Sequence, residues 1–496
     1  MEKLKKYLKQ FLVTVGTVFF WVFIWFLMAE KIDKSIFLPK PEETFHTLIK
    51  IVSSRLFFDT VKVSFVRIMK GFLLAVVSGC SLAALSYFFV MIKVLLAPVM
   101  RLIKAVPVAS FTILALLWVD SVRLSELVAF VIVLPVIYIN VLGGLESVKT
   151  EMLELAKVFR VSVFRKIRFL YIPAVFPAFT AACRIGLGFC FKAGIAAEVI
   201  GRPIHSIGGQ LYEAKLYLMT EELFAWTIVI VLLSMMIEGI CIYILNRVCE
   251  RMLHVKRLDI QQGRKRRRKN SLSSDIQQDK ERQGETSEHR IVLKNVGKNY
   301  SRHRVLADVS FEMKQGDRLC IMGESGAGKT TLLKMIMGLI RQDSGETDID
   351  RSLKMAAVFQ ESRLIEDTDI YTNIYFACGS AAQTAGGAFD EKKAALHLTK
   401  VGLSGLGEKM VNELSGGMKR RVEIVRAVMS EPELLLLDEA FNGLDSDTKK
   451  LVAEYLDEFC AGKMIIMVTH HKEEAALLNA GIYSGLLRNG DGNEYL

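Results

Sequence analysis

The 496-residue sequence lacks the cysteine patterns that define disulfide-rich and zinc-stabilised proteins. Its eight cysteines are scattered, and no two of them form a C-x-x-C pair. No histidine stands close enough to these cysteines to suggest a zinc site. We interpret the cysteines as small apolar residues in a reducing or membrane setting.

We also expect no cleavable leader at the N-terminus. The basic segment MEKLKKYLKQ precedes the apolar run FLVTVGTVFFWVFIWFLMAE, which is the order found in signal peptides. The run is too long for the apolar core of a signal peptide, and no A-x-A cleavage site follows it. We therefore expect a retained transmembrane helix that starts in the cytoplasm.

Apolar residues are abundant, at 51% of the chain, and the mean hydropathy is +0.32. Such a composition indicates that part of the chain lies in lipid. Five further runs are long enough to cross a bilayer, at residues 62–90, 97–119, 124–146, 174–200 and 223–246. Together with the first run they predict an all-α, six-span domain over residues 1–255.

Lysine and arginine residues gather in alternate loops of this domain. They precede the first span, lie between spans two and three and between spans four and five, and follow span six. Cytoplasmic loops of membrane proteins carry this excess of positive charge. The pattern predicts a multi-pass protein with both the N-terminus and the second half of the chain in the cytoplasm.

Residues 256–288 predict a charged, flexible linker that contains the block RKRRRK. A basic block can bind nucleic acid, or it can mark the cytoplasmic side of a membrane. This one follows soon after a span, which favours topology and attraction to anionic lipid. We expect membrane lipid, and no nucleic acid, as its partner.

The loop at about 145–177, LESVKTEMLELAKVFRVSVFRKIRFLYIPAVFP, predicts a short amphipathic helix on the cytoplasmic side. Its apolar contacts are expected from Leu153, Ala156, Val158, Phe159 and Val161. Such a helix either binds a protein partner or lies on the membrane surface.

Residues 289–496 have the rhythm of an α/β domain, with short apolar runs separated by turns and amphipathic helices. LCIMGESGAGKTTLLKMIMGLI reads as a strand, a glycine-rich loop and a helix, and it satisfies G-x-x-x-x-G-K-[ST]. The expected phosphate-binding residues are Gly323, Glu324, Ser325, Gly326, Ala327, Gly328, Lys329, Thr330 and Thr331. Lys329 would reach the β and γ phosphates of ATP, and Thr330 would bind Mg²⁺.

A second motif, ELLLLDEAFNGLD, predicts a buried strand that ends in two acidic residues. Asp438 would hold Mg²⁺ through water, and Glu439 would orient and deprotonate the attacking water. These residues predict an ATP hydrolase.

The segment NELSGGMKRRVEIVRAVMSEP resembles the signature of ABC ATPases. The resemblance implies that Leu414, Ser415, Gly416 and Gly417 face the γ-phosphate of ATP held by a second copy, together with Asp445. It further implies that Tyr300 stacks on adenine, that Gln360 links Mg²⁺ and water to the membrane contact, and that His470 senses the γ-phosphate. Met418 replaces the usual Gln of the signature, and Ala440 replaces a common Pro.

The loop between spans four and five resembles the EAA coupling loop of bacterial ABC importers, with Glu154-Leu155-Ala156 at the motif. The resemblance implies that Glu154, Ala156, Phe159 and Arg160 couple the two domains. Leu155 departs from the usual Ala, and Arg160 departs from the usual Gly. FLPKPEETF, KAVPVASFTILALLWV and SIGGQLYEAKLYLMTEELF extend the likeness to nitrate, sulfonate and taurine importers, over most of residues 30–246.

These observations predict a multi-domain chain in a bacterial cytoplasmic membrane: a transmembrane permease domain, a linker and an ABC ATPase domain. The resemblance implies a homodimer that uses ATP and Mg²⁺ to import a small molecule delivered by an extracytoplasmic substrate-binding protein. Two alternatives stay open: an exporter half-transporter, and a membrane-anchored ATPase that signals to an envelope partner without transport.

Overall fold

The computed structural model describes residues 2–267, 289–300, 303–324, 326–350, 352–378 and 389–483. The chain divides into two compact units. Unit 1 comprises Met1–Ser147 and Pro173–Arg251, and unit 2 comprises Val148–Ile172 and Met252–Leu496. The loop between the fourth and fifth predicted spans therefore folds with the second half of the chain.

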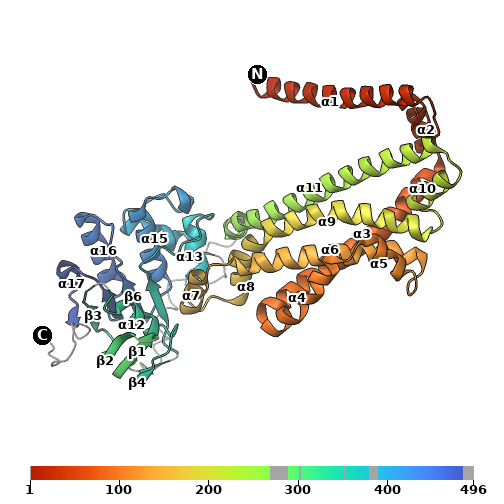
Figure 1. Cartoon of the computed structure of the whole chain (residues 1–496). Coiled ribbons are helices and arrows are strands. Elements are labelled where there is room, and N and C mark those ends of the chain that lie inside the picture. Colours follow the sequence, from red (N-terminus) through yellow and green to blue (C-terminus); the bar gives the residue numbers. More distant parts are fainter. Residues whose placement is uncertain are drawn as a thin grey trace. The chain divides into compact units, whose positions relative to one another are not determined.

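Unit 1 is helical (Figure 1). Its helices are α1 (Glu2–Ile32), α2 (Pro41–Ser53), α3 (Arg55–Phe88), α4 (Val90–Ala105), α5 (Val108–Ala115), α6 (Ser121–Glu146), α9 (Ile172–Gly201), α10 (Ile207–Leu216) and α11 (Thr220–Arg267). Five described segments are long and apolar enough to cross a membrane, and α4 with α5 adds a sixth if the bent pair is one span.

The third predicted span, 97–119, is not one straight helix. Helices α4 and α5 meet at an angle of 102°. Pro107 stands between them, in extended backbone, as the N-cap of α5. Proline has no amide hydrogen and disfavours helical backbone in the residue before it, so the α4 helix ends there. The predicted span at 97–119 therefore counts as the sixth only if this bent pair crosses the membrane as one unit.

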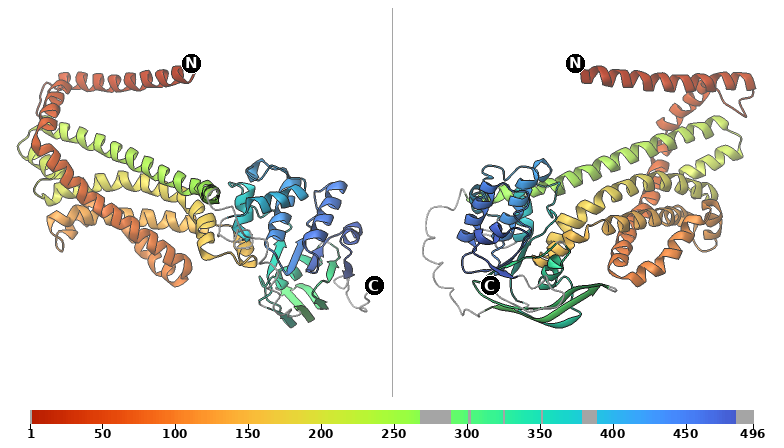
Figure 2. Two further views of the ribbon diagram at one scale, coloured as in Figure 1. Left: turned by 180° about the vertical axis from the view of Figure 1, so that it is seen from behind. Right: turned by 60° about the vertical axis from the view of Figure 1, so that its left-hand side comes forward.

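Helices α3 and α6 pack closely along their lengths (Figure 2). A Cβ atom added at Gly71 would lie 2.2 Å from the carbonyl oxygen of Glu126, and one added at Gly79 would lie 2.9 Å from Ile137. Small residues let membrane helices approach each other in this way. The glycines thus fix the α3–α6 contact that carries the core of unit 1.

Unit 2 contains two sheets and the helices that cover them. The antiparallel sheet has the order β2 (His303–Lys314), β1 (Arg290–Tyr300), β4 (Ser344–Ile349). The parallel sheet has the order β5 (Met355–Val358), β6 (Leu434–Asp438), β7 (Met464–Val468), β3 (Arg318–Ile321), β8 (Gly481–Tyr483). The helices are α7 (Thr150–Val158), α8 (Val163–Lys166), α12 (Lys329–Ile336), α13 (Ile370–Cys378), α14 (Glu391–Lys400), α15 (Gly416–Met429), α16 (Ser446–Phe459) and α17 (Lys472–Leu477), with a π-helical turn at Ile167–Tyr171 and a 3₁₀ turn at Val411–Glu413.

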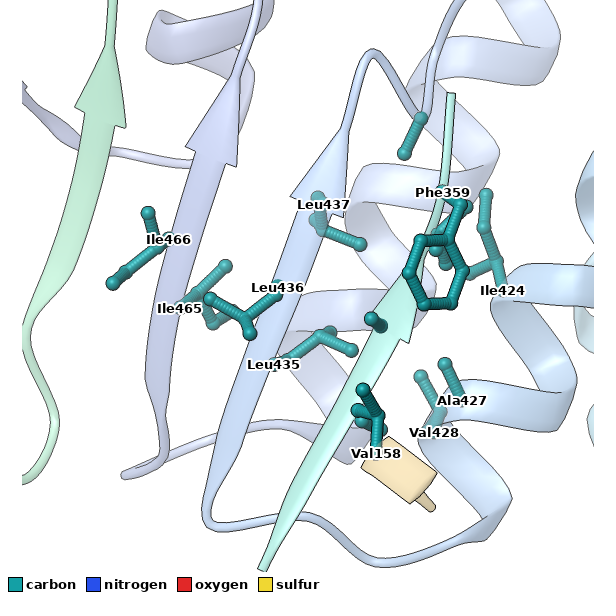
Figure 3. Packing of buried hydrophobic residues seen from close by; sticks show 14 of the residues in the cluster. Val158, Phe359, Ile424, Ala427, Val428, Leu435, Leu436, Leu437, Ile465 and Ile466 are labelled. Atoms are coloured by element: carbon teal, nitrogen blue, oxygen red, sulfur yellow. The ribbon is translucent and has the colours of Figure 1, made fainter. Parts of the chain in front are cut away.

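The core of unit 2 lies between the parallel sheet and α15 (Figure 3). All five residues of β6 and all five of β7 are buried, as expected for central strands covered on both faces. Figure 3 shows Val158 of α7 beside Ala427 and Val428 of α15. A helix from the first half of the sequence therefore completes the core of the second half.

The predicted linker 256–288 begins inside helix α11, which continues to Arg267. The remainder, residues 268–288, lies outside the described residues. The expected domain boundaries at 255 and 289 stay predictions.

Candidate active site

The glycine-rich loop joins β3 to α12, as the motif predicts. Gly326 and Gly328 both have φ of +86°, a region that glycine enters without strain. The Lys329 side chain folds back into the loop, where its Nζ donates hydrogen bonds of 2.7 Å to the carbonyl oxygens of Gly323 and Glu324. Burial lowers the pKa of Lys329, while the nearby carboxylates of Asp438 and Glu439 oppose that shift.

The remaining P-loop positions follow the same geometry. Thr330 and Thr331 lie in the first turn of α12, and Ala327 precedes it with its amide 3.2 Å from the carbonyl oxygen of Glu324. Ser325 lies outside the described residues.

Asp438 ends strand β6 and is 4% exposed. Burial raises the pKa of its carboxyl group, and a hydrogen bond from the Thr330 side chain opposes the shift. Its Oδ1 atom is buried without a hydrogen-bond partner among the described residues. A buried carboxylate oxygen beside a threonine hydroxyl is a donor set that suits Mg²⁺.

Three predicted catalytic residues follow three adjacent strands. Gln360 follows β5, Glu439 follows β6 and His470 follows β7, and these strands are neighbours in the parallel sheet. The Gln360 Nε2 atom lies 3.4 Å from Glu439 Oε2, and the His470 Nε2 atom lies 3.3 Å from Glu439 Oε1. The fold thus brings these side chains together at the carboxyl ends of the strands, where α/β proteins place their ligand sites.

The signature residues Leu414, Ser415, Gly416 and Gly417 lie at the N-terminus of helix α15. Ser415 caps helix α15, and its hydroxyl accepts a hydrogen bond of 3.4 Å from the Met418 amide. A Cβ added at Gly417 would lie 3.2 Å from the carbonyl oxygen of Gly443. Leu414 is buried at 7% exposure, whereas Gly416 has open space around it.

Asp445 caps the next helix, α16. It accepts hydrogen bonds of 2.9 Å from the Thr448 amide and hydroxyl, and these bonds lower the pKa of its carboxyl group. Tyr300 ends strand β1 and is 48% exposed, and the Lys298 Nζ atom lies 5.7 Å from the centroid of its ring. Met418 donates its backbone amide to the Ser415 cap, as other residues at this position could, and Ala440 is buried at 1% exposure.

The amphipathic helix α7 packs into unit 2 through a continuous apolar face. Leu155 and Ala156 are completely buried, and Val158, Phe159 and Val161 are buried at 8% exposure or less. These five residues belong to the same core cluster as β6 and α15. Leu153, which was also expected in the contact, is partly buried and packs against this cluster.

Arg363 of unit 2 holds this helix through polar contacts. Its Nη2 atom lies 2.9 Å from Glu154 Oε2, and its Nη1 donates to the Glu151 carbonyl oxygen at 3.0 Å. The guanidinium also lies 3.6 Å from the centroid of the Phe359 ring. Because Arg363 is only 8% exposed, the contacts at Nη1 and Nη2 replace part of the water that the charge loses on burial.

The contacts of Arg160 explain how an arginine can stand where the coupling-loop motif usually has a glycine. The residue has φ of +48°, in the left-handed region that favours glycine. Its guanidinium donates to the carbonyl oxygens of Ser352 at 3.0 Å and Leu353 at 2.9 Å. The hydrogen bonds therefore offset the backbone strain that an arginine incurs at this turn.

Phe359 and Gln360 join the contact with α7 to the predicted hydrolysis site. Phe359 is buried at 5% exposure beside Arg363, whereas Gln360 is exposed toward Glu439. Arg420 of α15 donates to the carbonyl oxygens of both residues, at 2.5 and 2.6 Å. One short segment after β5 therefore touches both sites, through the buried Phe359 and the exposed Gln360.

Sequence reasoning missed three residues of this arrangement: Leu155, Arg363 and Arg420. Leu155 was treated only as a departure from a motif, although its spacing from Val158 and Phe159 is helical. Arg363 and Arg420 belong to no motif, and each acts on a segment far away in the sequence. No local pattern marks such contacts.

Two family descriptions match this chain. Residues 71–255 match the binding-protein-dependent transport system inner membrane component, and residues 306–442 match the ABC transporter family. The chain belongs to the ABC transporter family, as an import-type member with permease and ATPase in one polypeptide. It is a multi-pass membrane protein with an ATP-binding domain. That domain couples ATP hydrolysis to transport.

Relatives of the ATPase half carry three different solute names. The ergothioneine transport ATP-binding protein EgtV of Helicobacter pylori (strain G27) is 36% identical over 38% of this chain and 93% of its own length. The taurine import ATP-binding protein TauB of Yersinia pestis bv. Antiqua (strain Antiqua) is 36% identical over 36% and 72%. The spermidine/putrescine import ATP-binding protein PotA of Mycoplasma capricolum subsp. capricolum (strain California kid / ATCC 27343 / NCTC 10154) is 36% identical over 37% and 55%.

Proposed function

We propose that two copies of this chain form an ATP-driven importer that receives a small solute from an extracytoplasmic substrate-binding protein. Each copy supplies one permease domain and one ATPase domain. The observation that carries the proposal is the burial of helix α7, from the permease half of the sequence, in the ATPase core. The N-terminus and the ATPase would lie in the cytoplasm, as the distribution of Lys and Arg predicts.

Hydrolysis is assigned to the residues around Glu439. Glu439 accepts a proton from the attacking water, Gln360 orients that water, and His470 contacts the γ-phosphate. Thr330, Asp438 and Gln360 would hold Mg²⁺, which neutralises phosphate charge when bound. Lys329 leaves its loop carbonyl partners to contact the β and γ phosphates, and Tyr300 stacks on adenine.

The two-copy arrangement follows from the position of the signature. Ser415 and Asp445 each cap a helix, and helix α15 packs on β5, α13, α14 and α16, whereas α12 packs on β2 and β6. The signature and the P-loop therefore begin two helices, α15 and α12, whose main contacts are with different elements. The γ-phosphate at Lys329 then meets Ser415 of a second copy, with Leu414, Gly416 and Gly417, at a helix N-terminus.

Mixing two inactive chains tests this arrangement. Lys329→Ala disables the P-loop and Ser415→Arg disables the signature, so each variant alone has no intact composite site. A mixed dimer contains one intact site, and we expect phosphate release to return only when the two variants are co-expressed. Full activity of the wild-type chain in a verified monomer, or no recovery in isolated mixed dimers, would refute the proposal.

Coupling is assigned to α7 and the segment after β5. The residues that bind the ATPase surface near Phe359 are Glu154, Ala156, Phe159 and Arg160. The contacts of Gln360 change when ATP binds or is hydrolysed. When two ATPase domains close over ATP, this contact moves the two permease domains between access states. Solute uptake into vesicles distinguishes this importer from an ATPase that only signals.

The ATPase half does not identify the solute. It is equally similar, at 36% identity, to proteins named for ergothioneine, taurine and spermidine/putrescine. Specificity in the chain must therefore come from the permease half, and we propose a small organic molecule or small anion as the solute.

A further inference from the structure

Helix α9 carries two positive charges at the middle of a predicted span. Arg184 lies twelve residues from Ile172, the first residue of α9, and Lys192 lies nine residues before Gly201, the last. At 1.5 Å per residue these positions are roughly 18 and 13 Å from the helix ends, inside a hydrocarbon layer about 30 Å thick. Ionised side chains at such depth face protein or a water-filled path, because lipid does not solvate them.

Both charges lie on the side of α9 that unit 1 leaves uncovered. The exposed residues of this side include Ala181, Arg184, Ile185, Phe189, Lys192 and Ala196. Arg184 has 62% of its side chain exposed, and its Nε lies 4.0 Å from Glu238 Oε1 of α11. Within the described ranges of the chain, no hydrogen bond or ion pair is made by Lys192.

The opposite side of α9 packs too tightly against α3 and α6 for the helix to rotate about its axis. A Cβ added at Gly194 would lie 2.7 Å from Ile68 of α3, and one added at Gly186 would lie 3.2 Å from Val133 of α6. Cys190 and Phe191 are buried on the same side. Close packing at the two glycines therefore fixes the rotation of α9 and keeps the charged side outward.

We propose that Arg184 and Lys192 line the solute path and bind the anionic group of the solute, a sulfonate or carboxylate. This inference rests on the proposed two-copy importer, in which the uncovered sides of both α9 helices face the path. Glu238 offsets part of the charge of Arg184, whereas Lys192 has no acidic partner among the described residues. Two copies then give a net positive path, which concentrates anions.

A cysteine reporter tests the path without requiring the solute. Phe189→Cys places a thiol between the two charges on the same side of the helix, and both charges remain. The full-length variant in membrane vesicles is treated with an anionic sulfonatoethyl or a cationic trimethylammonioethyl methanethiosulfonate. After correction for reagent reactivity and for the native cysteines, we expect the anionic reagent to react about tenfold faster.

Charge variants in the same background show which residues cause the preference. Arg184→Gln or Lys192→Gln should each reduce it several-fold, whereas Lys192→Arg should preserve it. Millimolar methanesulfonate should slow the labelling, and methylammonium should not. Val77→Cys, on an exposed apolar part of α3, is the control for a lipid-facing thiol and should react slowly with both reagents.

Three outcomes would overturn the inference. No reaction at Phe189→Cys with either reagent would place this side of α9 against lipid or protein. Equal rates, or a preference unchanged by the glutamine variants, would show a path without anion selectivity. The labelling does not depend on ATP hydrolysis, so it can fail while the mixed-dimer experiment succeeds, and the reverse also holds.

Discussion

The hydrolysis site and the docking contact lie on the two sides of one short segment, and they are built differently. At Gln360 the contacts to Glu439 and from Glu439 to His470 are 3.3 to 3.4 Å long, and Gln360 and His470 are exposed. At Phe359 the contacts are buried, and the polar atoms of Arg363 meet theirs at 2.9 and 3.0 Å. The first site leaves polar groups available to a ligand. The second pairs most of its polar atoms within the chain, although Arg363 Nε is buried without a hydrogen-bond partner among the described residues.

This difference matches two different tasks: ATP hydrolysis at one site and the transfer of movement at the other. A site that must accept phosphate and water cannot bury its catalytic groups against protein beforehand. A contact that transmits movement needs dense packing, because packed elements move together. Substitutions on the Gln360 side should therefore affect hydrolysis, and those on the Phe359 side should affect the coupling of hydrolysis to uptake.

The largest effect is expected from Glu439→Gln. The amide cannot accept a proton from water, so ATP hydrolysis should fall by about 100-fold or more while ATP binding remains. Phosphate release and nucleotide binding are measured on the purified chain. Glu366→Gln is the matched control, because that carboxylate is 66% exposed and should tolerate the change. Hydrolysis by Glu439→Gln at the wild-type rate would disprove its role.

A substitution on the docking side should separate hydrolysis from uptake. Leu155→Asp places a carboxylate at a completely buried position, which should weaken the contact by about 3 kcal/mol or more. We expect loss of solute uptake with basal hydrolysis retained. Phe159→Asp is a weaker test, because the Arg426 guanidinium lies 5.7 Å from the Phe159 ring centroid and could pair with the new carboxylate.

Thr150→Asp is the control for the docking variant. Thr150 is exposed at the first turn of α7, where an acidic residue is favourable. Normal uptake by Leu155→Asp would mean that α7 transmits nothing.

Low pH should destabilise the packing of helix α14 against helix α16. His397 of α14 is 4% exposed and lies 2.7 Å from the Tyr455 hydroxyl of α16. Burial, with a smaller contribution from Lys393, lowers the pKa of His397 to about 4, against opposition from Glu431 and Glu458. Between pH 6.5 and 4 the unfolded chain binds a proton that the folded chain does not, so stability falls as the pH falls.

We expect this titration to cost about 2 kcal/mol over that pH range, measured as thermal unfolding of the full chain. His397→Gln removes the titrating group and should flatten the pH dependence. An equally steep dependence in that variant would assign the acid sensitivity to other residues.

The smallest effect should come from Arg160, where strain and hydrogen bonding oppose each other. Arg160→Gly loses the bonds to Ser352 and Leu353 but removes the strain of a positive φ, so stability should change by less than about 1 kcal/mol. Arg160→Ala loses the bonds and keeps the strain, so it should be the less stable of the two. The reverse order would show that backbone strain plays no part there.

Most of the candidate site could be predicted because its parts are local. The P-loop is a run of consecutive residues, so its glycines and the start of its helix are adjacent in the sequence. The strand before Asp438 is marked by four leucines. The spans were predictable from length and hydropathy, apart from the break between α4 and α5. Pro107 marks that break in the sequence, but hydropathy alone does not distinguish one bent span from a straight one.

The sequence alone determined the chemistry that each residue can perform and the order of the elements. Carboxylates, hydroxyls and glycines keep their properties in any fold, and the hydrophobic periods fix helix or strand locally. Only the tertiary structure decided which residues meet. Adjacent parallel strands β5, β6 and β7 bring together Gln360, Glu439 and His470. Leu155 is buried because α7, which comes from the first half of the sequence, packs in the same core as α15. Such contacts depend on the free energy of burying surfaces that are distant along the chain, and no local pattern encodes it.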